Sequence, residues 1–203
     1  MPSGRRLGIL ISGRGSNLQA IADAIGAGRL DATIAVVVSS RGEAAGLDRA
    51  RAAGVDAVVV PARDYRDRDA YDRAVVEVLR ARTVDLVCLA GFMRLVGAPL
   101  LDAYPHRILN IHPSLLPAFP GLDAQRQALE YGVQVSGCTV HFVDDQLDHG
   151  VIVLQRTVKV AAGDDEATLN ARILEQEHLA YPEAIARVLS GNYRIAGRRY
   201  IPR

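Results

Sequence analysis

Short apolar segments alternate with amphipathic segments through the first half of the chain, and this alternation limits the possible folds more than any other feature. Strands are predicted at the mainly apolar segments 7–12, 34–39, 57–60 and 85–90, and the continuous apolar character of 7–12 is typical of a central parallel strand. Helices are predicted between them, from residue 16 onward, over 44–53 and over 66–82. Strands and helices that alternate at this spacing form an α/β fold, with an open, mostly parallel twisted sheet and helices on both faces.

The second half of the chain predicts a different local arrangement. Helices are expected at 124–131 and from about 165 to 191. Between them, 136–143 and 151–160 are strand-like and are joined by seven residues, which places an antiparallel strand near the C-terminal edge of the sheet. Residues 194–203 are basic and follow the last helix, so we predict a frayed tail there.

The composition describes an ordinary globular chain. Its 203 residues, 49% of them hydrophobic, suit one compact domain over residues 1–203. The net charge of +1 argues against nucleic acid or an anionic membrane as a partner. No apolar run approaches the roughly 20 residues of a membrane helix, and no signal-peptide core is recognisable. Cys88 and Cys138 lie in apolar segments without metal-ligand spacing, which favours buried thiols and a cytoplasmic location.

A glycine-rich turn, Gly13-Arg14-Gly15-Ser16-Asn17, connects the first strand to the first helix. Ser16 and Gln19 have the spacing of a capping box, which predicts the helix N-terminus at about Ser16. Backbone N–H groups and the positive end of the helix dipole then favour an anion. A dinucleotide site would need a third glycine where this chain has Leu18, and a P-loop would need Gly-Lys-Ser/Thr. A phosphate monoester is therefore favoured over NAD or ATP, and a purely structural turn is the alternative.

The loop at 91–96, after the fourth predicted strand, carries the unusual apolar residues Met93, Leu95 and Val96. In sheets of this kind, ligands bind outside the carboxyl ends of the strands. The loop is therefore either a pocket wall for a flat ligand or a small satellite of the core.

The segment Ile108–His112 is predicted as a strand on which Asn110 and His112 share a face, because side chains alternate along a strand. An amide that donates hydrogen bonds, beside an imidazole that exchanges protons near neutral pH, suits acyl transfer. The alternative is structural, with Asn110 bound to loop backbone and His112 closing the strand. We expect this pair, the glycine turn and the 91–96 loop to converge on one cleft.

The connection between the last two predicted strands is acidic. It contains Asp144, Asp145, Asp148 and His149. Such a segment is either a solvated loop or part of a site. Its spacing matches no EF-hand or zinc pattern, so no metal is predicted.

Several motifs occur in a specific order along the chain. They are Leu10–Ile21, Leu89–Arg94, Asn110–Pro117, His141–Val143 with Asp148, and Gln176–His178. From about residue 7 to 191 this combination resembles the phosphoribosylglycinamide formyltransferases of purine biosynthesis, which have a Rossmann-like formyltransferase fold. Asn-x-His-Pro-Ser with a later Asp is shared by folate-dependent formyltransferases generally, and the Gly-x-Gly-Ser-Asn turn indicates the glycinamide ribonucleotide branch.

The resemblance implies a role for each matching position. The catalytic residues would be Asn110, His112 and Asp148. The phosphoribosylglycinamide substrate would bind at Gly15, Ser16, Asn17 and Glu177. The 10-formyltetrahydrofolate cosubstrate would bind at Arg68, Met93, Arg94, Leu95, Val96, Asn110 and Asp144. The expected partners are these small molecules, without nucleic acid, membrane or metal, and the chain is expected to be a monomer or a homodimer.

Four residues depart from the family pattern. Relatives carry one or two histidines where this chain has Asp123 and Gln125, and often a polar substrate contact at Leu174, while His149 replaces a small residue beside Asp148. These changes are expected to leave the reaction unchanged and to affect substrate affinity.

Two alternatives to a transferase use the same fold. A formyltetrahydrofolate hydrolase would use the same three catalytic residues with water as the acceptor, but it needs no phosphate anchor. A non-catalytic sensor of phosphoribosyl ligands would not need the complete set of Asn110, His112 and Asp148.

Overall fold

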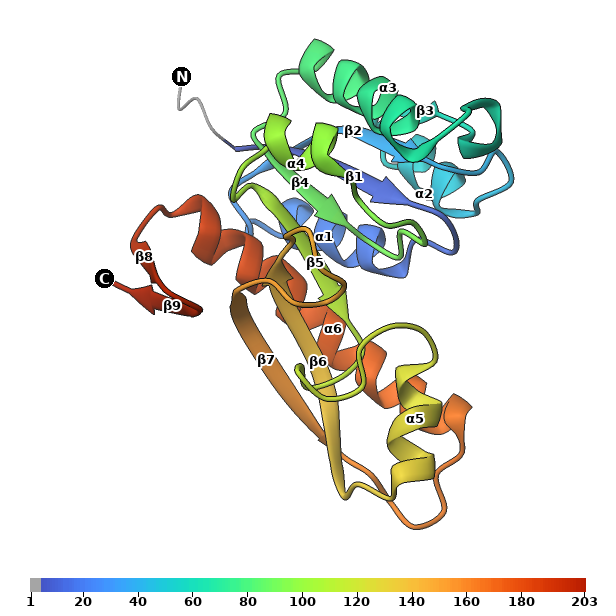
Figure 1. Ribbon diagram of the computed structural model, residues 1–203, viewed down its shortest axis with the longest axis vertical. Coiled ribbons are helices and arrows are strands. Elements are labelled where there is room, and N and C mark those ends of the chain that lie inside the picture. Colours follow the sequence, from blue (N-terminus) through green and yellow to red (C-terminus); the bar gives the residue numbers. More distant parts are fainter. Residues whose placement is uncertain (1–4) are drawn as a thin grey trace. The chain divides into compact units, whose positions relative to one another are not determined.

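The computed structural model describes residues 5–203, and the contacts of the chain separate into two compact units, Met1–Asn110 and Ile111–Arg203 (Figure 1). The boundary falls inside strand β5, after Asn110. A single domain over residues 1–203 stays a prediction.

The first unit is built on five parallel strands. They are β1 (Arg6–Ile11), β2 (Thr33–Ser39), β3 (Ala57–Val59), β4 (Leu86–Leu89) and β5 (Ile108–His112). Their order is β3-β2-β1-β4-β5, and every neighbouring pair runs parallel. Strand β1 lies between β2 and β4, and its residues from Leu7 to Ile11 are buried. Burial on both faces explains why its sequence is continuously apolar.

Helices cover both faces of this parallel sheet. They are α1 (Ser16–Gly26), α2 (Gly46–Ala52), η1 (Ala62–Asp64), α3 (Arg68–Ala81) and α4 (Ala98–Ala103). Helix α1 packs with α2 and α3 packs with α4, and Figure 1 shows the two pairs on opposite faces of the strands. Helix α4 was not expected from the sequence, because six residues with a proline in the first turn are too few to show helical periodicity.

The predicted capping box at the start of α1 is wrong. The helix does begin at Ser16, but its N-cap is Gly15, which has no side chain to accept a hydrogen bond. The Gln19 side chain donates forward to Asp23 at 2.8 Å instead of reaching back. A glycine N-cap leaves the N-terminal N–H groups facing outward, which suits an external anion better than a capping side chain would.

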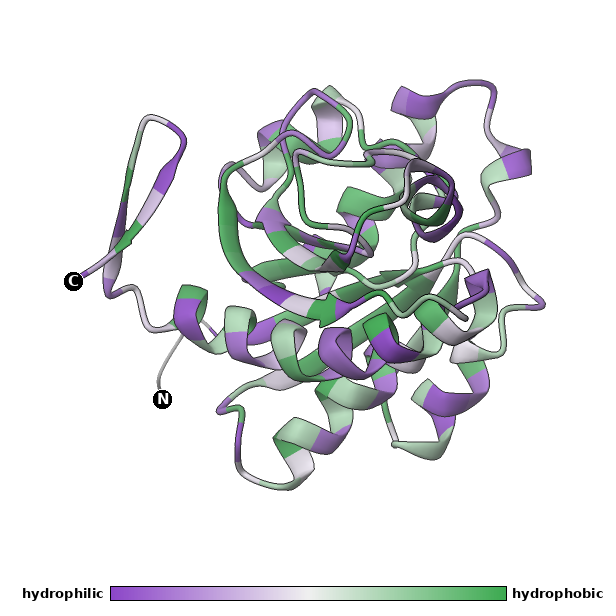
Figure 2. Cartoon of the chain, turned by 90° about the horizontal axis from the view of Figure 1, so that it is seen from below, coloured by the Kyte–Doolittle hydropathy of each residue, from purple (hydrophilic) through white to green (hydrophobic). Residues whose placement is uncertain are grey.

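The second unit places helices against antiparallel strands. Its elements are α5 (Ala124–Tyr131), β6 (Val135–Phe142), β7 (Ile152–Lys159), α6 (Glu166–Leu189), β8 (Tyr193–Ala196) and β9 (Arg199–Pro202). Strands β6 and β7 are antiparallel, as predicted, and α6 packs on both of them and on α5. Asp165 caps α6 in a reciprocal box with Thr168. Figure 2 shows that the helices and the C-terminal hairpin mix hydrophobic with hydrophilic residues.

The prediction of a frayed C-terminal tail is wrong. Residues 193–202 form the β8–β9 hairpin, and β9 pairs parallel with β7 at Ile152 and Arg199. The rings of Tyr193 and Tyr200 stack with their centroids 4.7 Å apart, and Gly197 has a φ of 58° in the two-residue turn. The basic composition concealed this aromatic pairing and its glycine turn.

Hydrogen-bonded neighbours along the strands follow the order β3-β2-β1-β4-β5-β6-β7-β9-β8. The predicted α/β fold, mostly parallel with an antiparallel strand near the C-terminal edge, is confirmed. Within residues 5–203, no helix combines the length and the apolar character that crossing a membrane requires.

Candidate functional site

The glycine turn after β1 presents the N-terminus of α1. Gly15 has a φ of 73°, a conformation that glycine adopts without a steric penalty. A Cβ on Gly15 would also lie 2.7 Å from the Cα of Gly46, so no larger residue fits unless the backbone moves. The amide of Gly46 donates to the carbonyl of Gly13 at 3.0 Å, which fixes the turn against α2. The result is a rigid helix start whose N–H groups can bind an anion.

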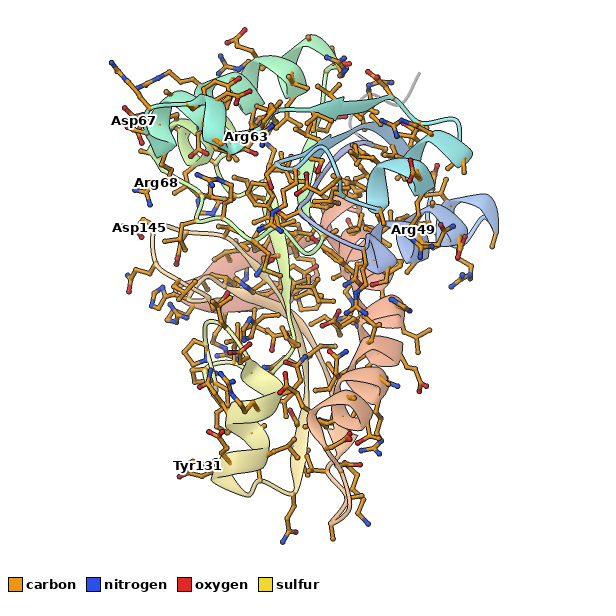
Figure 3. All side chains as sticks on the ribbon, turned by 90° about the vertical axis from the view of Figure 1, so that its right-hand side faces the viewer. Arg49, Arg63, Asp67, Arg68, Tyr131 and Asp145 are labelled. Atoms are coloured by element: carbon orange, nitrogen blue, oxygen red, sulfur yellow. The ribbon has the colours of Figure 1, made fainter. Side chains whose placement is uncertain are left out.

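Arg49 of α2, labelled in Figure 3, is a neighbour of this turn that the sequence analysis missed. Its Nε donates to the carbonyl of Arg14 at 3.0 Å while the side chain remains exposed. It adds a positive charge beside a turn that already favours anions. The two residues lie 35 positions apart, so only the packing of α1 against α2 brings them together.

The loop after β4 is anchored to the end of β1 through Ser12. The Ser12 amide donates to the carbonyl of Gly91 at 3.0 Å, and its hydroxyl accepts from the amide of Met93 at 3.0 Å. Met93 and Leu95 are 67% and 57% exposed, so these two side chains are not a satellite of the core. The glycine turn and the 91–96 loop therefore lie at the same edge of the first unit's sheet, as predicted. Their convergence with His112 stays a prediction.

Two arginines, Arg68 and Arg94, lie near the start of α3 in the first unit. The guanidinium of Arg94 lies 4.9 Å from the ring centroid of Tyr71, within the range of a cation–π contact. A Cβ on Gly97 would lie 2.9 Å from Nε of Arg68 and 2.9 Å from Oδ2 of Asp72, so this glycine allows the close packing of both side chains. Figure 3 shows Arg68 at the N-terminal end of α3, beside Asp67. These exposed cations can bind an anionic part of a ligand.

Asp72 is the buried carboxyl group of this cluster. It is 1% exposed and accepts a hydrogen bond from the amide of Gly97 at 2.6 Å. Burial raises the pKa of Asp72, and the Gly97 amide and the charges of Arg68 and Arg94 oppose that rise. The carboxyl group fixes the end of the 91–96 loop to α3, a contact that sequence reasoning did not predict.

His112 and Asp148 lie together in the second unit. Nδ1 of His112 is 3.3 Å from Oδ2 of Asp148, and the two side chains are only 6% and 9% exposed. Nε2 of His112 donates to the carbonyl oxygen of Phe119 at 2.8 Å, since a carbonyl can only accept. Both ring nitrogens therefore face oxygen atoms, one of a carboxylate and one of a backbone carbonyl. Asn110 lies two residues before His112 in β5, and its Cα is paired with that of Leu89.

Asp148 has two further partners. Its Oδ2 accepts from the amide of Gly121 at 2.8 Å, and its Oδ1 lies 3.8 Å from Nε2 of His141. Nδ1 of His141 donates to the carbonyl of Phe142 at 2.8 Å. Burial lowers the pKa of His141, and the Phe142 carbonyl and the Asp148 carboxylate only partly oppose this. His141 belongs to one of the sequence motifs, but no role was predicted for it. Its position near the end of a strand, before an acidic loop, could have indicated that it lies at the site.

The acidic connection between β6 and β7 is folded on itself. Asp144 accepts from the amide of Gln146 at 3.0 Å and from Nδ1 of His149 at 2.8 Å. Asp145, labelled in Figure 3, is exposed. Within residues 5–203, no group of three or more His, Cys, Asp or Glu side chains is arranged to hold a metal. Asp148 thus belongs to the His112 site, while Asp145 belongs to the solvated surface.

Glu177, the predicted substrate contact on α6, is 6% exposed. Burial, and to a smaller extent the Glu177 carboxylate, raise the pKa of Cys138 to about 12. Cys88 and Cys138 are both buried thiols, as the sequence predicted. A thiol with so high a pKa is not a nucleophile at neutral pH.

A mostly parallel α/β fold, a glycine turn that opens a helix N-terminus, and a buried His–Asp pair in the second unit are together features of an enzyme. The formyl transferase family model matches residues 5–185. The chain therefore belongs to the formyl transferase family, and its relatives and structural neighbours include phosphoribosylglycinamide formyltransferases.

Three similarities illustrate this relationship. The phosphoribosylglycinamide formyltransferase of Escherichia coli (strain K12) is 45% identical over 187 residues, which cover 92% of this chain and 88% of that protein. A crystal structure of glycinamide ribonucleotide transformylase 1 from Symbiobacterium toebii has a TM-score of 0.97 and 56% identity, covering 100% of this chain and 95% of that one. The trifunctional purine biosynthetic protein adenosine-3 of Drosophila pseudoobscura pseudoobscura is 46% identical over 192 residues, or 94% of this chain, and the match spans only 14% of that protein.

Proposed function

We propose that the chain transfers the formyl group of 10-formyltetrahydrofolate to the primary amine of 5-phosphoribosylglycinamide, a step of de novo purine biosynthesis. The observation that carries this proposal is the buried pair of His112 and Asp148, 3.3 Å apart, with Asn110 two residues earlier on the same strand. The phosphoribosylglycinamide formyltransferases that align with this chain over most of their own length support the choice of substrate.

The reaction needs no covalent enzyme intermediate, because the substrate amine attacks the formyl carbon directly. A C–N bond forms, the carbonyl oxygen becomes an oxyanion, and the nitrogen becomes an ammonium. Loss of the ammonium proton and protonation of N10 of the folate then allow the C–N10 bond to break. Water is not consumed, and the products are the formylated amide and tetrahydrofolate.

Each catalytic residue has a distinct role in this scheme. Asn110 donates a hydrogen bond to the oxyanion, an interaction that is strongest in the transition state. His112 supplies positive charge and moves protons, and Asp148 stabilises its imidazolium. Nδ1 faces Asp148, so Nε2–H is the ring donor that serves the substrate. In this scheme the oxyanion takes the place of the Phe119 carbonyl as the acceptor for Nε2–H.

The substrate and the cosubstrate are bound by residues other than His112 and Asp148. Gly15, Ser16 and Asn17 hold the ribose phosphate at the start of α1, and Glu177 binds the glycinamide part. The cosubstrate contacts are Arg68, Met93, Arg94, Leu95, Val96, Asn110 and Asp144. The cation–π geometry of Arg94 and the exposed apolar side chains of the 91–96 loop support a flat, anionic ligand there. A cytoplasmic location and a monomeric or homodimeric state stay predictions.

The decisive experiment follows loss of the formyl group from 10-formyltetrahydrofolate with and without phosphoribosylglycinamide. Loss that requires the amine supports the transferase. Loss at the same rate without the amine means a hydrolase, and binding of the ribonucleotide without any turnover means a sensor. The variant Asp145→Asn, in the same loop but exposed, serves as the control and should keep full activity.

A further inference from the structure

The tip of the C-terminal hairpin contacts the loop that carries Asp148. Arg198 lies in the turn between β8 and β9, and its Nη2 donates to the backbone carbonyl oxygen of His149. Nη1 of the same guanidinium lies 2.7 Å from Nε2 of His149. One arginine therefore contacts both the main chain and the side chain of the residue next to Asp148.

His149 is hydrogen-bonded in turn to Asp144. Its Nδ1 donates to Oδ2 of Asp144 at 2.8 Å, because a carboxylate only accepts. In the tautomer with its proton on Nδ1, Nε2 accepts from Nη1 of Arg198, which lies 2.7 Å from Nε2 and 3.1 Å from Nδ1. Asp144 also accepts from the amide of Gln146. Hydrogen bonds within the segment 144–149 therefore join its first residue to its last.

Asp148 depends on the backbone of this segment. It has a φ of 49°, in the left-handed region that a non-glycine residue adopts only when its surroundings require it. Its carboxylate must at once accept from the amide of Gly121 at 2.8 Å and lie 3.3 Å from Nδ1 of His112. Small backbone shifts at His149 would therefore move the carboxylate away from the imidazole.

We propose that Arg198 is a positioning residue, which fixes the 144–149 loop through His149 and so aims the Asp148 carboxylate at His112. The proposal rests on the proposed function, since it takes Asp148 to be catalytic. The family match ends at residue 185, so the hairpin lies outside the segment that defines the family. The positioning contact is thus supplied by the part of the chain beyond the common formyl transferase segment.

The test compares Arg198→Ala with Arg194→Ala, which removes the same charge from an exposed position of strand β8 in the same hairpin. Hydrogen–deuterium exchange of the backbone amides at 144–149 should become faster in Arg198→Ala and not in Arg194→Ala. Turnover should fall by roughly tenfold in Arg198→Ala while KM for phosphoribosylglycinamide stays constant, because misplacement of a catalytic group lowers kcat rather than binding of the other substrate. Arg198→Lys, which retains a donor at the end of the side chain, should recover part of the rate.

A double-mutant cycle with His149→Ala separates positioning from general stability. His149→Ala removes the side-chain contact of Arg198 and keeps the backbone carbonyl, so the variant that carries both changes should lose less rate than the sum of the two single losses. Additive losses, or equal effects of Arg198→Ala and Arg194→Ala on exchange, would overturn the proposal. Faster exchange with unchanged turnover would also overturn the proposal, because the loop would then loosen without moving the Asp148 carboxylate. Failure of the proposed function is recognised separately, by a near-normal rate in Asp148→Asn.

Discussion

Oδ2 of Asp148 lies 3.3 Å from Nδ1 of His112, and the pair is almost excluded from solvent. Charges interact more strongly where water is excluded, so a carboxylate at this distance acts strongly on any positive charge that the ring acquires during proton transfer. The second ring nitrogen donates to the carbonyl of Phe119, so the ring is oriented from both sides. The arrangement fits a histidine that supplies charge and protons in the same step.

Asp148→Asn should lower turnover by on the order of 100- to 10,000-fold, the usual value of a positioned acid/base. The amide can still accept from the amide of Gly121, so the loop is kept, but a neutral group no longer stabilises the imidazolium. Single-turnover kinetics with both substrates saturating would measure this change. Asp145→Asn, on the exposed side of the same loop, should behave as wild type. A near-normal rate in Asp148→Asn would assign the carboxylate a structural role.

Asn110→Ala should remove turnover while both substrates still bind, because the oxyanion exists only after the amine has attacked. Loss of one oxyanion donor typically lowers the rate by about 100- to 1000-fold. Calorimetric titration with each substrate separately, beside the rate measurement, separates the two effects. If affinity for both substrates falls in parallel with the rate, Asn110 is a binding residue rather than an oxyanion donor.

Most of the fold could be predicted because burial dictates local pattern. The strand Ile108–His112 and the helix Ala124–Tyr131 have the predicted bounds. Helix α4 has too few residues for periodicity, and the hairpin at 193–202 has a basic composition that concealed its paired tyrosines. Local charge was a poor guide where aromatic stacking and strand pairing decide the structure.

The site could be predicted only where chain neighbours share a strand or a turn. Asn110 and His112 follow from alternation along β5, and Gly15 follows from the turn before α1. The 3.3 Å contact between His112 and Asp148 was expected from family resemblance, since 36 positions separate the two residues. Nothing local predicted Arg49 at the glycine turn, which depends on the packing of α1 against α2.

Gly15→Ala should destabilise the protein. A left-handed φ of 73° costs an L-residue roughly 1–2 kcal/mol, and the new methyl group would lie 2.7 Å from the Cα of Gly46. A loss of this size should lower Tm by at least about 2–8 °C in a chain of this length. Gly13→Ala is the matched control, because no atom lies within 4 Å of a Cβ at that position. Equal melting temperatures for the two variants would contradict the steric argument.

The same pair of variants tests the anion site. At a temperature where both are folded, Gly15→Ala should raise KM for phosphoribosylglycinamide and leave KM for 10-formyltetrahydrofolate nearly unchanged. Gly13→Ala should leave both constants close to wild type. An equal rise of both constants in Gly15→Ala would mean that the turn has only a structural role.

Asp72→Asn should change how stability depends on pH. Burial raises the pKa of Asp72 above its ordinary value of 3.8, so the folded chain binds this proton more tightly than the unfolded chain does. The protonated Asp72 therefore contributes its full stabilisation of the folded state only below pH 3.8, the pKa in the unfolded chain. This contribution to the free energy of unfolding is lost as pH rises from 3.8 through the raised pKa of the folded chain. Asparagine is neutral at every pH and can still accept from the amide of Gly97, so the variant should lack this loss.

Urea unfolding midpoints measured from pH 3.5 to about pH 7 should show the stability of Asp72→Asn rising relative to that of the wild type as pH rises. Glu77→Gln, at an exposed position of the same helix, should show no such trend, and a pH-independent difference between Asp72→Asn and wild type would contradict the raised pKa.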